Sequence, residues 1–196
     1  MQKLLSLILI LSLFVTHAAA DVYPLTTDPV TDKPLPEKPV IYEHEGRELR
    51  FTDETSLETF KKDPATVLKK VDGRIIEQQL NAYPLTQCAV SGEPLGSMGE
   101  PVNLVVQNRL VRVCCSGCKK SAAKDFDSVK KKLDDAIIEK QLATYPLKTC
   151  VVSGDELGDD AVNHVHGTTL VRLCCNGCVK TFGKNPQMYL EKRAAK

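Results

Sequence analysis

The chain has 196 residues, and its 26 lysine and arginine residues almost balance its 25 aspartate and glutamate residues. A net charge near zero, the lack of tryptophan and an aromatic content of only 5% argue against the basic, base-stacking surfaces of nucleic-acid-binding proteins. The eight cysteines are the compositional feature that points to a specific chemistry.

The first twenty residues form a segment separate from the fold. Lys3 provides a positive charge, Leu4 to Val15 is almost entirely apolar, and Ala18 to Ala20 supplies the small residues of a cleavage site. This pattern is typical of a signal peptide, and it is too short and wrongly flanked for a membrane span. We expect cleavage after Ala20 and a periplasmic or secreted mature chain. No membrane span is predicted later, because no other apolar run approaches the roughly 20 residues that a span needs.

The rest of the chain repeats itself about every sixty residues. Each repeat opens with Tyr-Pro-Leu, at Tyr23, Tyr83 and Tyr145, and continues into a turn-rich loop. Repeats of this kind indicate a chain built from similar structural units. We therefore divide the chain into the signal peptide, residues 1–20, and units one, two and three, which are residues 21–82, 83–144 and 145–196.

Each unit is predicted to contain a β-hairpin followed by helix. Short runs rich in β-branched residues flank a turn in every unit, which is typical of two adjacent antiparallel strands. The predicted strands are Val40–His44, Glu48–Phe51, Val102–Val106, Arg109–Val113, Val162–His166 and Thr169–Leu173. Helical spacing follows the hairpins, for example over Ser116–Lys124 and Ser128–Leu142. The predicted fold class is α+β, with three tandem small units that each have a turn-rich loop, a hairpin and one or two helices.

Unit one has the repeat pattern without its cysteines. Asp28 stands where the other units have their first cysteine, and Thr52 and Ser56 stand where they have a Cys-x3-Cys pair. We interpret unit one as a degenerate, metal-free terminal repeat, since terminal repeats are often atypical. A site for a hard metal ion, built from Asp28, Asp53 and Glu54, is the alternative.

Units two and three contain all eight cysteines, four in each. One lies in the opening loop, and three follow the second strand as Cys-Cys-x-Gly-Cys. They are Cys88, Cys114, Cys115 and Cys118 in unit two, and Cys150, Cys174, Cys175 and Cys178 in unit three. A cysteine in a turn and a close pair at a strand-to-helix junction is how small zinc sites gather thiolates. The positive end of the helix also favours the thiolate that a metal requires.

The motif that follows the cysteines resembles the YHS domain and its relative, the TRASH domain. Cys-x3-Cys followed by Phe-x2-Asn-Pro-x2-Tyr-Leu is their signature. Unit three has it at Cys174, Cys178, Phe182, Asn185-Pro186 and Tyr189-Leu190, and unit two has Ala122 and Phe126 in place of the Phe and the Pro. The resemblance implies a treble-clef-like metal-binding module associated with heavy-metal sensing, trafficking and resistance. It implies that Cys88, Cys114 and Cys118, and likewise Cys150, Cys174 and Cys178, are ligands. Cys115 and Cys175 are additional to the pattern and are either fourth ligands or spare thiols.

Two other uses of the cysteines stay open. An exported chain with an even number of cysteines in each unit can form disulfides and act as an interaction protein without metal. A thiol oxidoreductase using Cys-x2-Cys is the third alternative, but no thioredoxin-like βαβ pattern surrounds the motif. We predict metal binding, by Zn(II) first and by Cu(I) or another soft heavy metal next. The expected partners are the metal ion and, in addition, another exported protein.

The remaining candidates favour ordinary structural roles. His164 and His166 share one face of a predicted strand and could supply nitrogen ligands, but a solvent-facing pair is the favoured interpretation. The lysine runs Lys119-Lys120 and Lys130 to Lys132 are interleaved with acidic residues and indicate solvated helix faces. The Tyr-Pro-Leu segments are expected to pack each opening loop onto its own or a neighbouring unit. No arrangement of catalytic residues is recognisable, so we do not expect an enzyme.

Overall fold

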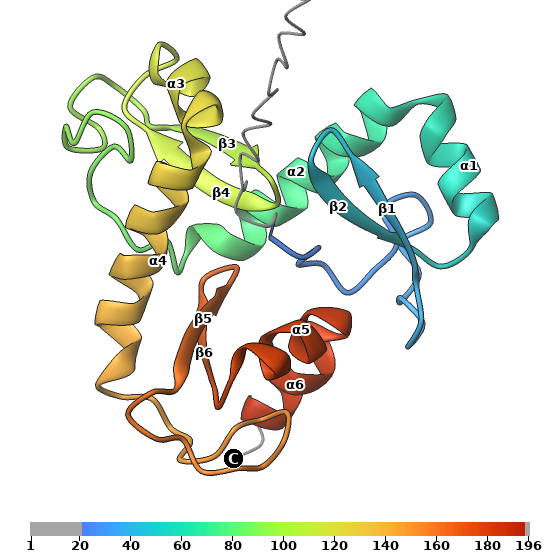
Figure 1. Cartoon of the computed structure of the whole chain (residues 1–196). Coiled ribbons are helices and arrows are strands. Elements are labelled where there is room, and N and C mark those ends of the chain that lie inside the picture. The colour runs from blue at the N-terminus through green and yellow to red at the C-terminus, as the bar shows by residue number, and fades with distance from the viewer. Residues whose placement is uncertain (1–20, 195–196) are drawn as a thin grey trace, which may run out of the picture.

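The computed structural model describes residues 21–194, and the predicted signal peptide therefore lies outside the described residues. Three units of the same design follow one another (Figure 1), each with a two-stranded antiparallel hairpin and two helices. The predicted α+β fold of three hairpin-helix units is confirmed. Among residues 21–194, no helix is both long and apolar enough to cross a membrane.

The hairpin and the two helices follow one another in the same order in the three units. Unit one contains β1 (Val40–His44), β2 (Arg47–Phe51), α1 (Glu54–Lys62) and α2 (Pro64–Leu80). Unit two contains β3 (Val102–Val106), β4 (Arg109–Val113), α3 (Cys118–Lys124) and α4 (Phe126–Leu142). Unit three contains β5 (Val162–His166), β6 (Thr169–Leu173), α5 (Asn176–Lys184) and α6 (Pro186–Ala194).

The opening loop of each unit is a tight turn held by backbone hydrogen bonds. The amide of Asp28 donates to the carbonyl of Lys33 at 2.8 Å, and the amides of Cys88 and Cys150 make the same bond to Glu93 and Asp155, each at 2.7 Å. The opening turns of the three units therefore have the same backbone hydrogen bond, whether the residue at this position is an aspartate or a cysteine.

The Tyr-Pro-Leu segments pack each loop onto its own unit, as predicted. In units two and three the tyrosine hydroxyl accepts a hydrogen bond from the second strand, Tyr83 from the amide of Arg112 at 2.9 Å and Tyr145 from that of Arg172 at 3.0 Å. Tyr23 is 2% exposed and donates to the carbonyl of Thr27 at 3.0 Å. These contacts fix the loop against the hairpin and so position the residues at its tip.

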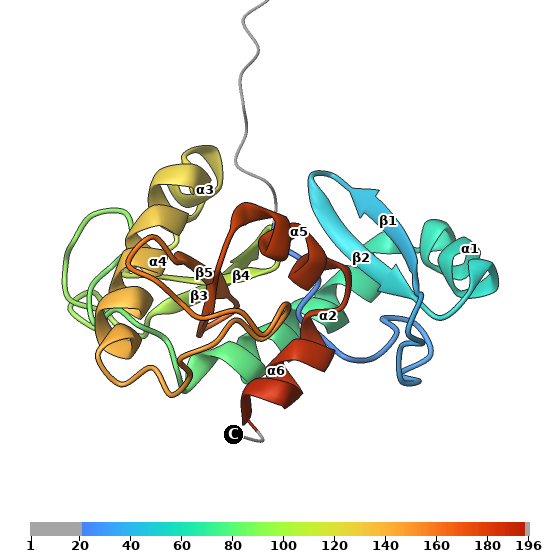
Figure 2. The ribbon, with the colours of Figure 1, turned by 60° about the horizontal axis from the view of Figure 1, so that its bottom comes forward.

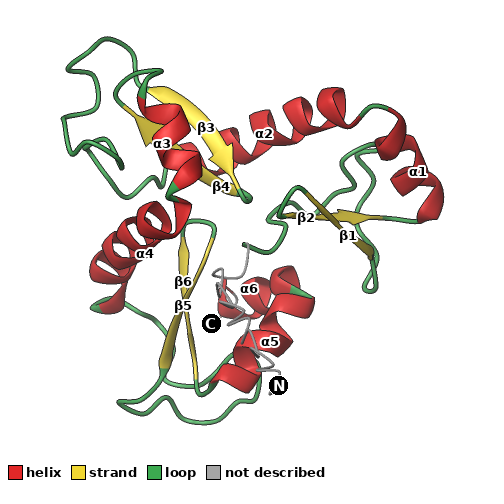
Figure 3. Ribbon diagram, turned by 45° about the horizontal axis from the view of Figure 1, so that its top comes forward, coloured by secondary structure: helices red, strands yellow, loops and turns green. Residues whose placement is uncertain are grey.

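A glutamine at the end of each connecting helix joins one unit to the next. Gln79 in α2 accepts from the amide of Leu110 at 2.9 Å and donates to the carbonyl of Asn108 at 3.2 Å. Gln141 in α4 makes the same pair of bonds to Leu170 and Thr168, each at 2.8 Å. Figure 3 shows the result, in which α2 and α4 each run from one unit to the hairpin of the following unit.

A buried ionic cluster joins all three units. Arg109, which is 1% exposed, donates to Asp21 of unit one at 2.7 Å, to Asp134 of its own unit and to the carbonyl of Gly167 in unit three. Lys130 lies 3.2 Å from Asp21 and 2.7 Å from Asp134. Burial opposes the charge of Asp21, but Arg109 and Lys130 hold the pKa of its carboxyl below its usual 3.8. The prediction of a solvated lysine run was wrong for Lys130, because the neighbouring units cover it.

Unit three also contacts unit one directly. The guanidinium of Arg50 donates to the carbonyls of Gly183 and Lys184, at 2.5 and 2.9 Å, and so binds the carboxyl end of α5. In Figure 2 this helix lies next to β2. The chain therefore closes on itself, with contacts between units one and two, two and three, and three and one.

The prediction of a solvent-facing histidine pair in unit three was wrong. His166 is 7% exposed, and the rings of His164 and His166 lie edge-on to Phe182, with centroids 5.3 and 5.7 Å away. Phe182 belongs to α5, so the first helix of the unit covers the face of β5 that holds both histidines. Burial of this face depends on that packing, and the alternation of the strand residues does not reveal it.

Candidate metal centres

The two cysteine-bearing units bring the loop cysteine to the cysteines at the strand-to-helix junction. In unit two, Cys88 lies at the start of the tight opening turn, while Cys114 follows β4 and Cys118 begins α3. Strand β4 ends at the junction, and the loop packs against the same strand, with the amide of Ala89 donating to the carbonyl of Arg112 at 3.4 Å. Residues separated by some 25 positions therefore meet.

The meeting sulfurs form two triads of the size that a metal ion requires. The Sγ atoms of Cys88, Cys114 and Cys118 all lie within 4.8 Å of one another, and so do those of Cys150, Cys174 and Cys178. The junction pairs are separated by 3.9 Å (Cys114 to Cys118) and 3.5 Å (Cys174 to Cys178). Sulfurs bound tetrahedrally to zinc at about 2.3 Å are about 3.8 Å apart. The donor type and spacing of both triads therefore fit a thiophilic metal ion.

The second cysteine of each Cys-Cys-x-Gly-Cys sequence lies beside the triad of its unit. Cys115 Sγ is 4.0 Å from Cys114 Sγ, and Cys175 Sγ is 3.9 Å from Cys174 Sγ, but neither belongs to the mutually close group. Cys115 is half-buried and Cys175 is exposed. All eight predicted ligands are thus gathered at two sites. Whether Cys115 and Cys175 complete the coordination stays a prediction.

The loop cysteine is the thiolate of each triad. Burial opposes the ionisation of Cys88, but hydrogen bonds from the hydroxyl and amide of Ser91 and from the amide of Cys114 lower the pKa of its thiol to about 6. Cys150, with Ser153 in the place of Ser91, also has a pKa of about 6. Each site therefore holds a negative sulfur near neutral pH.

The cysteine in the first turn of the helix, in contrast to the loop cysteine, stays protonated in each triad. Burial and the adjacent thiols raise the pKa of Cys118 and of Cys178 to about 12. A second and third thiolate are unfavourable beside the first one, because like charges repel in a partly desolvated site. A bound cation removes that penalty and displaces the protons, which is how metal binding couples to thiol ionisation.

The structure adds three polar neighbours that the sequence alone did not single out. The hydroxyls of Ser91 and Ser153 lie 3.5 and 3.4 Å from the sulfurs of Cys114 and Cys174. The carboxylate of Asp155 lies 3.8 Å from the sulfur of Cys174. The repeated Val-Ser-Gly sequence in units two and three was the available signal for the serines.

Unit one has a carboxylate where the other units have a sulfur triad. Asp28 is fully buried, and its two oxygens accept from the amides of Val30, Thr31 and Thr52 and from the hydroxyls of Thr52 and Ser56, at 2.7–3.0 Å. Thr52 and Ser56 occupy the positions of the junction cysteines. The acidic side chain is fully hydrogen-bonded within the unit, and its carboxylate links the loop to the junction as a metal ion would.

The alternative of a hard-metal site in unit one has no geometric support. In residues 21–194, the two cysteine triads are the groups of three or more His, Cys, Asp or Glu ligand atoms that lie within 4.8 Å of one another, and neither includes Asp28. Asp53 instead caps α1, with Oδ1 accepting from the amide of Ser56 at 2.9 Å. The interpretation of unit one as a degenerate, metal-free terminal repeat stays a prediction.

Comparisons of the chain with protein-family models, with curated proteins and with solved structures find no match. The resemblance to YHS and TRASH domains therefore rests on the motif residues and on the two cysteine triads. What the structure establishes is three repeated hairpin-helix units, two of which have cysteine triads positioned to bind metal.

Proposed function

We propose that the protein is an exported metal-binding protein that holds one thiophilic metal ion in unit two and one in unit three. Zn(II) is the first candidate and Cu(I) or another soft heavy metal the second, since thiolate sulfur favours both. The role is metal sequestration or trafficking, or structural support of each unit by zinc. Binding, and not catalysis, is the proposed activity.

The observation that carries this proposal is the pair of sulfur triads. Six cysteines from two separate units converge in two groups, each with a loop cysteine and a junction pair, and no two of the eight cysteines are joined by a disulfide bond within residues 21–194. A disulfide-stabilised protein would need these sulfurs joined in pairs at about 2 Å. The junction pairs instead stand at 3.5 and 3.9 Å, the spacing of ligands around a shared ion.

Export is proposed from the sequence of the first twenty residues alone, and the residue that follows them already belongs to the fold. Asp21 is 9% exposed and forms part of the cluster that joins the three units. The first residue after the proposed cleavage site thus belongs to the folded protein. Intact mass and N-terminal sequencing of protein recovered from an exporting host test the cleavage after Ala20.

Metal binding is tested by elemental analysis combined with a thiol count on one anaerobic sample. We expect two equivalents of metal per chain and at least the six thiols of the two triads to react only after a chelator is added, with eight thiols in total after denaturation. Less than half an equivalent of metal, together with no reactive thiols after denaturation, would show that the cysteines are paired in disulfides and would overturn the proposal.

A further inference from the structure

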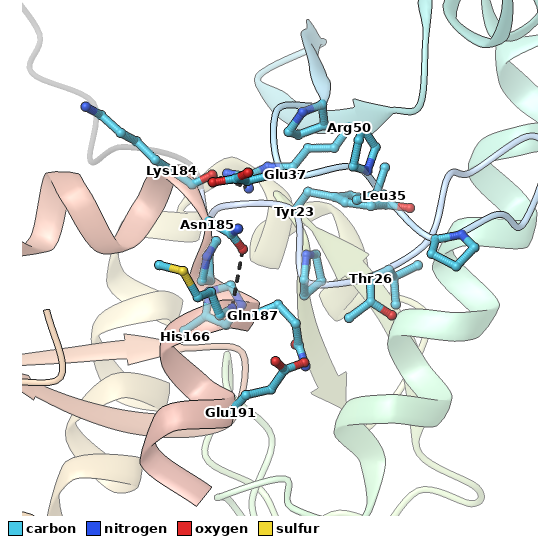
Figure 4. A pocket seen from close by; sticks show the side chains of 17 residues that line it. Tyr23, Thr26, Leu35, Glu37, Arg50, His166, Lys184, Asn185, Gln187 and Glu191 are labelled. Atoms are coloured by element: carbon cyan, nitrogen blue, oxygen red, sulfur yellow. Dashed lines mark hydrogen bonds between the residues drawn. The ribbon is translucent and has the colours of Figure 1, made fainter. Parts of the chain in front are cut away.

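A cavity of about 390 Å³ lies between unit one and unit three, away from both sulfur triads. Its walls are the opening loop of unit one and the turn between α5 and α6 (Figure 4). Its volume falls within the range of small-molecule binding sites. Because its two walls belong to different units, the cavity exists only when the chain is closed by the contact of Arg50 with α5.

One wall of the cavity is apolar and rigid. Pro24, Leu25, Pro34, Leu35 and Pro36 of the opening loop line it together with Pro186 of unit three. Prolines restrict the backbone, so this surface is held in shape before any ligand arrives. It suits a compact apolar group.

A buried histidine with no hydrogen-bond partner lines the other side. His166 is 93% buried, and within residues 21–194 its imidazole makes no hydrogen bond. The ring nitrogens of His166 are not among the fully enclosed polar atoms of residues 21–194 that lack a partner, so they remain accessible to a ligand in the cavity that they line. Burial lowers the pKa of His166 to about 4, so that its ring is neutral and offers a nitrogen lone pair.

The charges around the cavity favour a hydrogen-bond donor over an acceptor. Glu37 and Glu191 line it, and the amide of Gln187 donates to the carboxylate of Glu191 at 3.0 Å and so orients it. The guanidinium of Arg50 is already committed to Glu48 and to two carbonyls. Lys184 extends away from the other labelled side chains in Figure 4. The available polar groups are therefore mainly acceptors, and the uncompensated charge is negative.

We propose that this cavity binds a small organic cation, namely a protonated amine on an apolar body. Its ammonium group donates to the carboxylate of Glu191 and to the imidazole of His166, and its apolar body lies against the proline and leucine wall. An organic carboxylate would face Glu37 and Glu191 and should bind more weakly because of repulsion. The site is separate from the cysteine triads and does not depend on metal binding.

The test is an NMR titration of the ¹⁵N-labelled full chain with three phenylalkyl probes of similar size and different charge. Phenethylamine is the cation, 2-phenylethanol the neutral control and 3-phenylpropionate the anion. We expect phenethylamine to shift saturably the amide signals of residues 23, 25, 26, 185, 187 and 188, with the other two probes binding at least about tenfold more weakly, as one charge-assisted hydrogen bond predicts.

Two variants locate the interaction. Glu191→Gln keeps the size of the side chain and should weaken phenethylamine binding about tenfold, whereas Glu139→Gln, an exposed glutamate on α4 outside the cavity, should leave it unchanged. His166→Leu should weaken it as well. The proposal is overturned if the three probes bind alike, if Glu191→Gln binds phenethylamine as the parent chain does, or if the signals of these residues do not move.

Discussion

At the scale of single residues, Asp28 explains how unit one keeps the repeat fold without a sulfur triad. Its carboxylate receives five hydrogen bonds from the loop and from the strand-to-helix junction, and so connects the two segments that the cysteines approach in the other units. Burial opposes its ionisation, but the amides of Thr52 and Thr31 hold the pKa of this carboxyl below its usual value.

Asp28→Asn should destabilise the protein by about 2–4 kcal/mol, since an amide NH2 group would face donors that need an acceptor. Chemical denaturation measures this change. Asp32→Asn is the matched control, because Asp32 lies in the same turn, is 54% exposed and makes surface ion pairs with Lys70 and Arg74. Such pairs contribute at most about 1 kcal/mol. Equal losses for the two variants would contradict the proposed role of Asp28.

His166 makes stability depend on pH. Burial lowers its pKa from 6.5 to about 4, so the folded chain lacks a proton that the unfolded chain binds between these values. Stability is therefore unaffected by this group above pH 6.5, and it falls as the pH drops toward about 4, by on the order of 3 kcal/mol in full.

His166→Val, which copies Val106 at the same position of unit two, should flatten the fall in stability between pH 6.5 and 4 whatever it does to stability at neutral pH. Denaturant midpoints across this range provide the measurement. His44→Val, the same change at the half-exposed equivalent in unit one, serves as control. An unchanged slope for His166→Val would show that other groups cause the acid sensitivity.

At the scale of elements, the turn, the hairpin and the first helix form one scaffold that accepts either a carboxylate or a sulfur triad. The backbone bonds of the loop are the same in all three units, although unit one has Asp28 where the others have cysteine. The side chains of Thr52 and Ser56 already point at this carboxylate. A change of three side chains should therefore change the chemistry without changing the fold.

The triple substitution Asp28→Cys, Thr52→Cys and Ser56→Cys should create a third metal site. Elemental analysis should then find three equivalents of zinc per chain, against two for the parent. Ser56→Cys alone is the control and should add none, because one thiol cannot hold the ion. A triple variant that folds, as judged by circular dichroism, and still binds two equivalents would refute the equivalence of the three scaffolds.

The strands could be predicted from the sequence more closely than the helices. Five of the six predicted strands match residue for residue, because β-branched runs and turn residues mark them locally; β2 begins at Arg47, one residue earlier than predicted. The helices α3 and α4 begin at Cys118 and Phe126, two residues later and two residues earlier than predicted. Phe126 enters the core of unit two, and this long-range packing sets the start of α4.

The convergence of the cysteines could be predicted from the repeat, but the burial of the polar residues could not. Spacing and the loop-plus-junction pattern predicted which sulfurs converge. The burial of His166, Lys130 and Asp21 depends on how one unit covers another, and a single sequence without contacts does not give that information. Arg109 is also fully buried, but nothing in the sequence around it on β4 indicated that it would contact all three units.

At the scale of the whole molecule, the three units behave as one closed assembly. Each of these short units has a small core and gains stability from its neighbours, because small domains bury little surface alone. Arg109 contacts groups from all three units, and Arg50 joins the last unit to the first. The charges of Asp21, Arg109, Lys130 and Asp134 balance within the buried cluster.

Asp21→Asn should cost about 3–5 kcal/mol, since it leaves buried cations without their partner. We expect the parent chain to unfold in a single calorimetric transition and the variant in more than one, with the units melting separately. Asp135→Asn is the control, because its ion pair with Lys131 is exposed and should matter by less than about 1 kcal/mol. A single transition of unchanged midpoint for Asp21→Asn would argue against a central role for the cluster.

The measurement that tests the central claim most directly is anaerobic native mass spectrometry of the parent chain and of Cys150→Ser. The account predicts two metal ions on the parent chain and one on the variant, because Cys150 belongs to the triad of unit three alone. The complementary variant Cys88→Ser should likewise keep one ion, in unit three. A metal-free parent chain lighter by about two mass units for each disulfide formed, or the loss of both ions from Cys150→Ser, would contradict two independent thiolate sites.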